Sequence, residues 1–365
     1  MNRPDYGFMP AASKFPSQKM KAVILAGGKG TRMRPLTYTR VKAMIPFLNK
    51  PVLEHIVTKL ASQGFEEIIL TTNYKTEQIA DCFGDGKKFG CKFTIATEKD
   101  ALGTAGSVKN AMGCLDETFA VIQGDNISEI DIGALYHKHK KMGGLATISL
   151  MEVEDVSHFG IAEMKGDEIV RFKEKPKPEE TFSNLANAGI YILEPEALDM
   201  IPLAFYDFSR NLFPKMLEEK KKICGAVSHN FWKDVGRPED YLTATHYMLK
   251  QKNVIGEGCH TNGATIMESV LGDNCKVQGS SIVSSVLFDN VTVEKGAKLK
   301  HCIVGSNCII GEGVDIWPGA VIGDDVEIIG NCVVHGNARV GPCIKLKGDK
   351  MIEGTIVPEH LKEVD

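Results

Sequence analysis

The sequence predicts an α/β protein in which a mixed, mostly parallel sheet is followed by a left-handed parallel β-helix. Between Lys21 and about Lys250, short apolar runs alternate with helix-like stretches, and after about residue 251 apolar residues recur every six positions. Strands that alternate with helices indicate a parallel sheet with helices on both faces. The length of 365 residues fits two domains, or three, at ~150 residues each.

The first part of the chain contains apolar runs with the length and composition of buried strands. They are rich in Val, Ile, Leu and Phe, most of which are enriched in strands. The expected strands are Ala22–Leu25, Glu67–Thr72, Phe93–Thr97 and Phe119–Ile122, and the expected helices include Val52–Gln63 and Thr76–Asp81. Ligands of such sheets bind at the carboxyl ends of the strands, so the residues that follow these strands are candidates for a site.

The second part contains a hexapeptide repeat. Its apolar first positions are Val304, Ile310, Ile316, Ile322, Ile328, Val334 and Val340. Four places after each comes a small or apolar residue, from Cys308 to Ile344. Three hexapeptides make one coil of a left-handed β-helix, so we expect roughly five coils of ~18 residues. Cys259, Cys275, Cys308 and Cys332 fall on the inward fifth position, which predicts structural rather than reactive thiols.

Composition excludes several classes of protein. Lys and Arg number 43 against 47 Asp and Glu, and the net charge of −4 gives no basic footprint for nucleic acid. No apolar run approaches the ~20 residues that span a bilayer, so no membrane association is expected. The 10 cysteines include no C-x-x-C pair, which argues against structural zinc and for reduced thiols in a cytoplasmic protein.

A glycine-rich loop, Ala26-Gly-Gly-Lys-Gly-Thr-Arg32, follows the first expected strand. Glycines allow backbone N–H groups to approach phosphates closely. Two familiar phosphate loops are excluded, because G-x-G-x-x-G needs glycine where Met33 stands and G-x-x-x-x-G-K-[ST] needs it where Val23 stands. A basic loop remains, with Lys29, Arg32 and Arg34; an ordinary strand-to-helix turn is the alternative.

The segment Leu25–Thr37 resembles the opening motif of the sugar-1-phosphate nucleotidyltransferases, or nucleoside-diphosphate-sugar pyrophosphorylases. Further motifs follow in the order of that family: Lys42 in Val-Lys-Ala-Met-Ile-Pro46, Leu102-Gly-Thr-Ala-Gly106, Gly124-Asp125, Phe159-Gly160, Phe172-Lys-Glu-Lys-Pro176, Asn187-Ala-Gly189 and Trp232-Lys-Asp-Val-Gly236. Val41 and Ala43 depart from the prolines usual around the lysine. The resemblance covers residues 21 to about 250 and implies a Rossmann-like domain that transfers a nucleotidyl group from a nucleoside triphosphate to a sugar 1-phosphate.

Four segments are therefore expected. Residues 1–20 form a flexible N-terminal extension, 21–250 the nucleotidyltransferase domain and 251–345 the β-helix, a common attachment in this family. Residues 346–365 form a capping tail, in which Pro358 begins a short helix.

The resemblance also assigns roles to single residues. The expected catalytic residues are Arg32, Lys42 and Lys175, and the expected nucleotide contacts are Leu25, Gly27, Gly28, Gly30, Thr31, Glu98, Gly103 and Thr104. Gly160, Glu174, Lys175 and Asn187 are expected to bind the sugar phosphate, and Asp125 and Asp234 to bind Mg²⁺.

These residue types suit the reaction. Charge develops on phosphate groups that are already anionic, so cations such as Arg32 and Lys42 stabilise the leaving pyrophosphate. Hard carboxylate oxygens suit Mg²⁺. The alternatives are solvated surface cations, an Asp-Asn turn at Asp125, and an exposed charged loop around Lys175.

Glu98 bears on the choice of base. Related uridylyl- and thymidylyltransferases usually have Gln five residues before the Gly of Leu-Gly-Thr, and here that position, counted back from Gly103, is Glu98. An ionised carboxylate only accepts hydrogen bonds, and guanine offers the adjacent donors N1–H and N2–H₂. We therefore expect GTP and mannose 1-phosphate, as in the mannose-1-phosphate guanylyltransferases; the alternative is that Glu98 faces solvent.

Other functions remain open at this point. They are a glucose-1-phosphate thymidylyl- or uridylyltransferase, a bifunctional uridylyltransferase and acetyltransferase with His301 or His335 as base, and a non-catalytic regulatory subunit. We expect the β-helix to support a homo-oligomer, because Trp317 beside Pro318 is predicted to face outward.

Overall fold

The computed structural model describes residues 20–362, so most of the expected N-terminal extension lies outside the described residues. The chain forms two compact units. The first, here called the sheet unit, contains residues 20–28 and Leu53–Lys233. The second, the solenoid unit, contains Lys29–Val52 and the chain from Asp234 onward. The glycine-rich loop thus passes from one unit to the other after Gly28.

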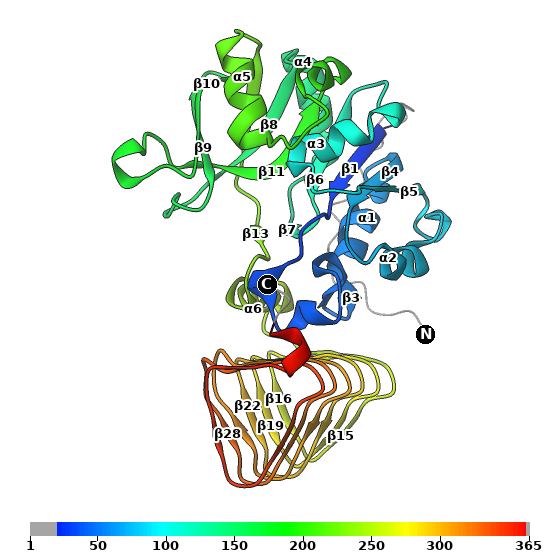
Figure 1. Ribbon diagram of the computed structural model, residues 1–365, viewed down its shortest axis with the longest axis vertical. Coiled ribbons are helices and arrows are strands. Elements are labelled where there is room, and N and C mark those ends of the chain that lie inside the picture. The colour runs from blue at the N-terminus through cyan, green and yellow to red at the C-terminus, as the bar shows by residue number, and fades with distance from the viewer. Residues whose placement is uncertain (1–19, 363–365) are drawn as a thin grey trace. The chain divides into compact units, whose positions relative to one another are not determined.

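The sheet unit is built on a nine-stranded mixed sheet (Figure 1). Its strands, in spatial order, are β5 (Lys92–Thr97), β4 (Phe65–Thr72), β1 (Met20–Leu25), β6 (Phe119–Gln123), β11 (Leu185–Leu193), β8 (Ala146–Glu152), β12 (Ile223–Ser228), β10 (Glu168–Glu174) and β9 (Gly160–Lys165). β10 and β11 run against the other strands, so the sheet is mixed, as predicted, with parallel pairing along β5–β4–β1–β6 and between β8 and β12. β1 lies between β4 and β6 and is apolar throughout its central residues, as a strand buried on both faces requires.

Helices accompany the strands of the sheet unit, namely α1 (Val52–Ser62), α2 (Thr76–Phe83), α3 (Gly103–Asn110), α4 (Ile132–Met142) and α5 (Phe213–Glu218). The helix expected to end at Asp81 continues to Phe83, because that side chain is buried and Gly84 then ends the helix with a φ of 55°. α4 begins where the Asp131 carboxylate accepts a hydrogen bond from the Ala134 N–H at 2.8 Å. No helix among residues 20–362 is long and apolar enough to cross a membrane.

A buried polar network lies between α4 and the sheet. His139 is fully buried, with Nδ1 2.7 Å from Thr147 Oγ1 and Nε2 3.2 Å from Glu194 Oε1. Glu194 also accepts hydrogen bonds from Thr118 (2.5 Å) and Lys140 (3.0 Å). Desolvation lowers the pKa of His139 below its usual value, although Glu194 opposes the shift.

This network predicts a loss of stability in mild acid. The folded state binds a proton at His139 less readily than the unfolded chain, whose histidine pKa is ~6.5. The contribution to the free energy of unfolding is therefore present above pH ~6.5 and lost as the pH falls through the folded pKa. Urea unfolding of the wild type at pH 7 and pH 5 measures it. His139→Gln, which cannot titrate, should show a smaller difference; an equal difference would contradict this interpretation.

The solenoid unit contains a left-handed parallel β-helix made of three sheets. The first sheet consists of β14 (Val254–Ile255), β17 (Val270–Leu271), β20 (Val286–Leu287), β23 (Ile303–Val304), β26 (Val321–Ile322), β29 (Arg339–Val340) and β32 (Thr355–Ile356). The second consists of β15 (His260–Asn262), β18 (Lys276–Gln278), β21 (Thr292–Val293), β24 (Ile309–Ile310), β27 (Glu327–Ile329) and β30 (Lys345–Lys347). The third consists of β16 (Thr265–Met267), β19 (Ser281–Val283), β22 (Lys298–Lys300), β25 (Asp315–Ile316), β28 (Val333–Val334) and β31 (Met351–Ile352).

The coils are more numerous than the repeat predicts. Paired residues of the first sheet are 254, 270, 286, 303, 321, 339 and 355, which gives successive coil lengths of 16, 16, 17, 18, 18 and 16 residues. The strict period of six identifies only the 18-residue coils. The shorter coils at both ends do not follow this period, so the repeat does not predict them. The coils continue past residue 345, where Ile352 is still buried, and a 3₁₀ helix (Glu359–Leu361) follows Pro358.

The inward positions of the solenoid are those the repeat predicts. Cys275, Cys308 and Cys332 are fully buried, whereas Cys259 in the first coil is half-buried. Burial raises the pKa of Cys275 and Cys308 to about 12, which keeps these thiols protonated and inert. Each donates a hydrogen bond to a backbone carbonyl of the next coil, as from Cys275 to Phe288 at 3.2 Å.

The solenoid unit also contains the segment Lys29–Val52 and α6 (Pro238–Leu249). In that segment, 3₁₀ helices (Thr31–Met33, Leu36–Tyr38 and Lys42–Met44) lead to a hairpin of β2 (Pro46–Phe47) and β3 (Lys50–Pro51). The short strands β7 (Asn126–Ser128) and β13 (Trp232–Asp234) lie outside the nine-stranded sheet, and the chain leaves the sheet unit within β13.

Candidate active site

The glycine-rich loop leaves the sheet at the carboxyl end of β1. Leu25 is the last strand residue, and its carbonyl accepts a hydrogen bond from the Gly124 N–H at 2.8 Å. A Cβ at Gly28 would meet no atom within 4 Å, and one at Gly27 would meet Asn73 Oδ1 at 3.8 Å. The space beside the backbone is thus open at Gly27 and Gly28, as close approach of phosphates requires.

The loop continues in the solenoid unit, where three of the predicted charged residues come together. Lys42 Nζ lies 3.9 Å from Asp234 Oδ1, and both side chains are largely buried or half-buried. A Cβ at Gly236 would lie 3.2 Å from Arg32 Nη2 and 3.3 Å from Asp234 Oδ2. Gly236 therefore allows the guanidinium and the carboxylate to approach the backbone from the same side. The structure thus brings two cations and one carboxylate together, and the two cations make the local charge favourable to an anionic ligand.

Gly30 determines the shape of this part of the loop. Its φ of 66° is in the left-handed region, and a Cβ there would lie 3.0 Å from both Lys42 Cβ and Thr37 Cγ2. Thr37 Oγ1 donates a hydrogen bond to the Gly30 carbonyl at 2.8 Å. Thr31 then begins the 3₁₀ helix that carries Arg32. Gly30 thus lets the loop bring Arg32 and Lys42 into place, and any other residue at this position would be strained.

Glu98 lies in the sheet unit, directly after β5, and its N–H donates to the Thr72 carbonyl at 3.0 Å. The residue is only 6 % exposed, so the alternative that it faces solvent is wrong. Oε1 is buried and has no hydrogen-bond partner among the described residues. Because an unsatisfied buried carboxylate oxygen is costly, its position favours an incoming donor.

Gly103 and Thr104 begin α3 and pack on the segment 206–208. Gly103 has a φ of 71°, and a Cβ there would lie 2.8 Å from the Tyr206 carbonyl oxygen. Thr104 Oγ1 donates to Asp207 Oδ1 (3.1 Å) and accepts from the Phe208 N–H (3.0 Å). The Thr104 side chain thus holds this segment in place, a role that the motif alone does not show.

The residues predicted to bind the sugar phosphate lie together in the sheet unit. A Cβ at Gly160 would lie 2.8 Å from Glu174 Oε2. Lys175 follows β10 with a φ of 46°, and its N–H donates to the Phe159 carbonyl at 2.9 Å. Desolvation raises the pKa of Glu174, while Lys175 and Arg210 oppose the shift.

Asn187 completes this group. It is 9 % exposed, and its amide nitrogen donates to Tyr191 Oη (2.9 Å) and Ser209 Oγ (3.1 Å). Sequence reasoning missed Ser209 and Arg210, which come from the π-helical turn Phe208–Leu212 and face Glu174 and Asn187. No sequence motif marks this turn. Only its contact with Asn187 in the folded chain identifies it as part of the group.

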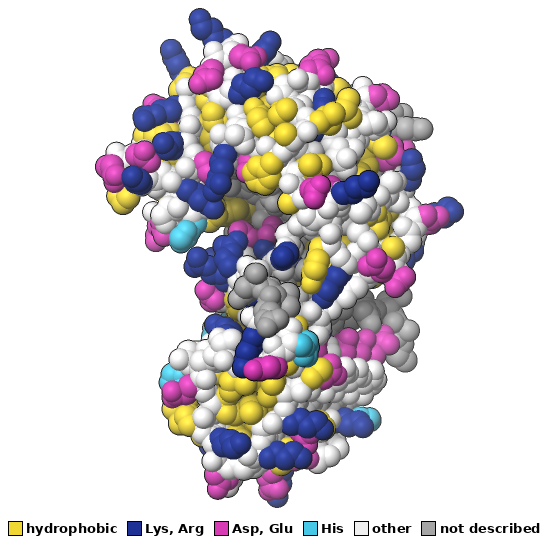
Figure 2. Space-filling view, in the orientation of Figure 1, with side chains coloured by type: hydrophobic (Ala, Val, Ile, Leu, Met, Phe, Trp, Pro, Cys, Tyr) yellow, Lys and Arg dark blue, Asp and Glu magenta, His cyan; other side chains and the backbone are white. Residues whose placement is uncertain are grey.

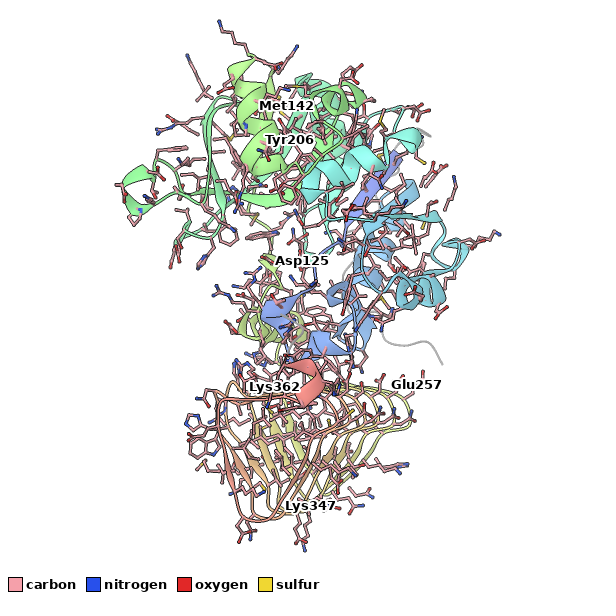
Figure 3. The ribbon with its side chains drawn as sticks, in the orientation of Figure 1. Asp125, Met142, Tyr206, Glu257, Lys347 and Lys362 are labelled. Atoms are coloured by element: carbon pink, nitrogen blue, oxygen red, sulfur yellow. The ribbon has the colours of Figure 1, made fainter. Side chains whose placement is uncertain are left out.

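Asp125 stands at the carboxyl end of β6, where ligands of parallel sheets bind (Figure 3). The neighbouring Asn126 is buried and donates to the Ala188 carbonyl at 2.7 Å. Gly189 has a φ of 69°, and a Cβ there would meet Gln123 Cγ at 2.6 Å. Asp125 belongs to the sheet unit and Asp234 to the solenoid unit.

Residues 21–251 match the family model described as nucleotidyl transferase. The chain belongs to this family. Residues 235–334 match the model of the EIF2B subunit epsilon LbH domain.

The relatives that match nearly the whole chain include two enzymes whose names specify nucleotides with different bases. The mannose-1-phosphate guanyltransferase of Yarrowia lipolytica is 37 % identical over 90 % of this chain and 98 % of its own length. The UTP–glucose-1-phosphate uridylyltransferase of a Synechocystis strain is 33 % identical over 92 % of this chain and 87 % of its own length. The structure of HddC from Yersinia pseudotuberculosis, complexed with GMP-PN, matches 62 % of this chain and 97 % of that chain with a TM-score of 0.53 and 29 % identity.

The chain is therefore a sugar-1-phosphate nucleotidyltransferase, with a nucleoside triphosphate and a sugar phosphate as substrates. Enzymes of this family generally use a divalent metal. Among residues 20–362 there is no group of three or more His, Cys, Asp or Glu side chains that could hold a metal ion.

Proposed function

We propose that this nucleotidyltransferase converts GTP and mannose 1-phosphate to GDP-mannose and pyrophosphate. The observation that carries the proposal is Glu98, whose buried carboxylate has an oxygen without a hydrogen-bond partner among the described residues. Guanine presents two adjacent N–H donors, and a carboxylate can accept from both. Uracil and thymine present a donor between acceptors, which a carboxylate serves less well.

In the proposed reaction the sugar phosphate oxygen attacks the α-phosphorus of GTP, and pyrophosphate leaves. Arg32 and Lys42 bind the triphosphate and stabilise the charge that develops on the leaving group. The N–H groups of Gly27, Gly28 and Gly30 bind phosphate oxygens, and Leu25 and Thr31 line the same loop. Gly103 and Thr104 line the nucleotide site through the backbone of α3.

The sugar phosphate is oriented by the group around β10. Lys175 binds its phosphate, while Glu174 and Asn187 accept from or donate to its hydroxyls, and Gly160 leaves room for the ring. The raised pKa of Glu174 supports this role, because a carboxylate in a desolvated site gains from hydroxyl donors.

Asp125 and Asp234 would hold Mg²⁺. The donor set fits, because Mg²⁺ is bound by one or two protein carboxylates together with waters and substrate phosphates. A Cβ at position 236 would lie 3.3 Å from Asp234 Oδ2, so the glycine there leaves space beside this carboxylate. When bound, the ion would neutralise phosphate charge beside Lys42 and Arg32.

The test is product analysis. The protein with GTP, mannose 1-phosphate and Mg²⁺ should form GDP-mannose and pyrophosphate in equal amounts, and excess chelator should stop both. GDP-mannose formation that is absent under these conditions, with UDP-glucose formed from UTP and glucose 1-phosphate, would assign the chain to the uridylyltransferases instead.

We also propose a cytoplasmic homo-oligomer that assembles through the solenoid. All ten cysteines are free thiols, which fits a reducing compartment. Hydrophobic side chains gather on the face of the solenoid seen in Figure 2. Trp317 is 38 % exposed, and its ring lies 5.2 Å from that of His335. Exposed tryptophan is enriched at interfaces.

Trp317→Glu should lower the mass that light scattering measures, because a charge at an apolar interface is left without a partner. Ile329→Glu, which changes a residue of equal exposure on another sheet, is the matched control and should keep the native mass. An unchanged mass for the Trp317 variant would exclude Trp317 from the interface.

A further inference from the structure

One corner of the solenoid carries a column of aspartates. The Asp273 carboxylate accepts a hydrogen bond from the Glu257 N–H at 2.9 Å, and that of Asp289 accepts from the Asp273 N–H at 2.8 Å. Further along the column, Asp324 Oδ1 accepts from the Ser306 N–H at 2.8 Å. One oxygen of each carboxylate thus accepts a hydrogen bond from the backbone of the neighbouring coil.

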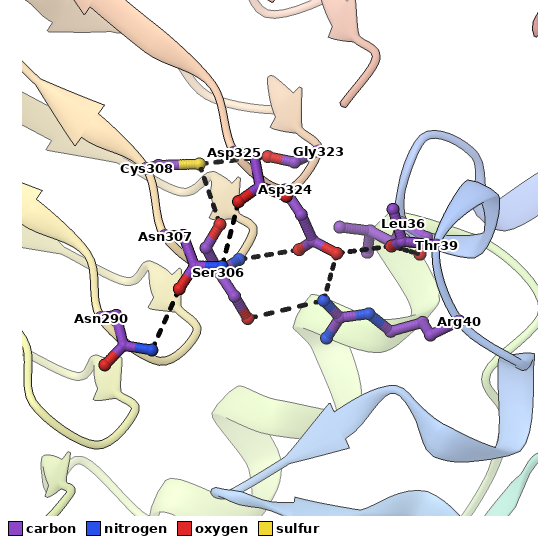
Figure 4. A network of polar contacts seen from close by, with 10 residues as sticks. All are labelled: Leu36, Thr39, Arg40, Asn290, Ser306, Asn307, Cys308, Gly323, Asp324 and Asp325. Carbon is purple, nitrogen blue, oxygen red and sulfur yellow. Dashed lines mark hydrogen bonds and ion pairs between the residues drawn. The ribbon is translucent and has the colours of Figure 1, made fainter. Parts of the chain in front are cut away.

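The second oxygen of Asp324 contacts the segment Lys29–Val52. Oδ2 accepts a hydrogen bond from Thr39 Oγ1 at 2.5 Å and forms an ion pair with Arg40 (Figure 4). Arg40 also reaches Ser306 Oγ at 3.5 Å, and its guanidinium lies 4.9 Å from the centre of the Phe288 ring. The side chains of Arg40 and Asp324 are only 16 % and 7 % exposed, so solvent screens this pair weakly.

Arg40 and Thr39 belong to the same segment as the catalytic cations. Lys42 begins a 3₁₀ helix two residues after Arg40, and its side chain packs against Gly30, just before Arg32. Asn49 Nδ2 donates to the Leu271 carbonyl at 2.6 Å, which fixes the far end of the segment on the first coils. Asn49 and the Thr39–Arg40 pair thus both attach the segment to the solenoid, and Asp324 supplies the attachment next to Lys42.

We propose that Asp324 is a positioning residue for nucleotidyl transfer, which acts through Thr39 and Arg40 on the loop that carries Arg32 and Lys42. The inference rests on the proposed roles of those two cations. It gives the solenoid a part in catalysis beyond assembly, because a cation displaced by ~1 Å from the leaving group loses much of its effect in the transition state.

The test compares Asp324→Asn with Asp289→Asn in the full-length protein. In both variants the amide oxygen can still accept from the neighbouring coil, but only the Asp324 variant removes the charge that faces Arg40. We expect Asp324→Asn to lower kcat for pyrophosphate release ~10-fold with less than ~3-fold change in the KM for nucleotide, and Asp289→Asn to match the wild type.

Variants at Arg40 make the test independent of the folding of the Asp324 variant. Arg40→Gln should lower kcat as Asp324→Asn does, Arg40→Lys should retain more activity because it keeps the charge, and the double variant Arg40→Gln/Asp324→Asn should be no worse than either single one. If Asp324→Asn does not fold, Arg40→Gln decides. Wild-type kcat in Arg40→Gln would overturn the proposal, as would additive effects in the double variant.

Amide hydrogen exchange separates this proposal from the proposed function. Exchange over residues 29–49 should be faster in Asp324→Asn than in Asp289→Asn, whichever substrates the enzyme uses. Equal exchange in the two variants would overturn the positioning role. A wild type that releases no pyrophosphate from any substrate pair would instead overturn the proposed function.

Discussion

Replacing Asp234 with asparagine is expected to lower kcat by ~10²–10³-fold, the loss typical of removing one group that stabilises charge in a transition state. The change keeps the shape of the side chain and removes its charge. Lys42, 3.9 Å away, then loses the carboxylate that orients its ammonium group. The carboxylate that would hold Mg²⁺ is lost as well, so the Mg²⁺ concentration for half-maximal activity should rise.

Initial rates of pyrophosphate release across a Mg²⁺ titration measure this effect. Glu239→Gln is the matched control, because it removes a carboxylate from the exposed first turn of α6 in the same unit. The control should keep the wild-type kcat and Mg²⁺ dependence. A kcat for Asp234→Asn within ~3-fold of the wild type would remove Asp234 from the catalytic site.

Replacing Glu98 with glutamine is expected to lower kcat/KM for GTP by ~10–10²-fold and to leave that for UTP unchanged or raised. Each hydrogen bond to a charged acceptor contributes about 1.5–3 kcal/mol, and the amide of glutamine turns one acceptor into a donor. That donor would face the N–H groups of guanine. Toward uracil, the mixed donor and acceptor set of glutamine is the better complement.

The ratio of kcat/KM for GTP to that for UTP is the quantity to measure, because it cancels general damage to the enzyme. Glu77→Gln, on the exposed face of α2 in the same unit, is the control and should keep the wild-type ratio. If Glu98→Gln also keeps that ratio, the buried carboxylate does not read the base, and the assignment to GTP loses its main support.

The sequence predicted the sheet and the solenoid from periodicity. Val23 and Ile24 mark β1 because a strand between two parallel neighbours is apolar on both faces. The hexapeptide period marks the coils of 18 residues and misses those of 16 and 17, in which Val254 and Thr355 still pair in register. Coils of 16 or 17 residues thus keep the strand pairing but break the period of six.

The candidate site was predicted in part. The motifs named Arg32, Lys42 and Asp234, which the structure brings together in the solenoid unit. They could not name Arg40 and Asp324, which are 284 residues apart and lie in no shared pattern. Contacts of this kind depend on where a solenoid corner meets a loop, and only the folded chain shows that.

The central claim is tested most directly by a matrix of GTP, UTP, dTTP and ATP against mannose 1-phosphate, glucose 1-phosphate and glucosamine 1-phosphate, read as pyrophosphate release with Mg²⁺. The account predicts the highest kcat/KM for GTP with mannose 1-phosphate, ~10-fold or more above each other pair, as expected for a base read by hydrogen bonds. A higher kcat/KM for UTP or dTTP with glucose 1-phosphate would contradict it.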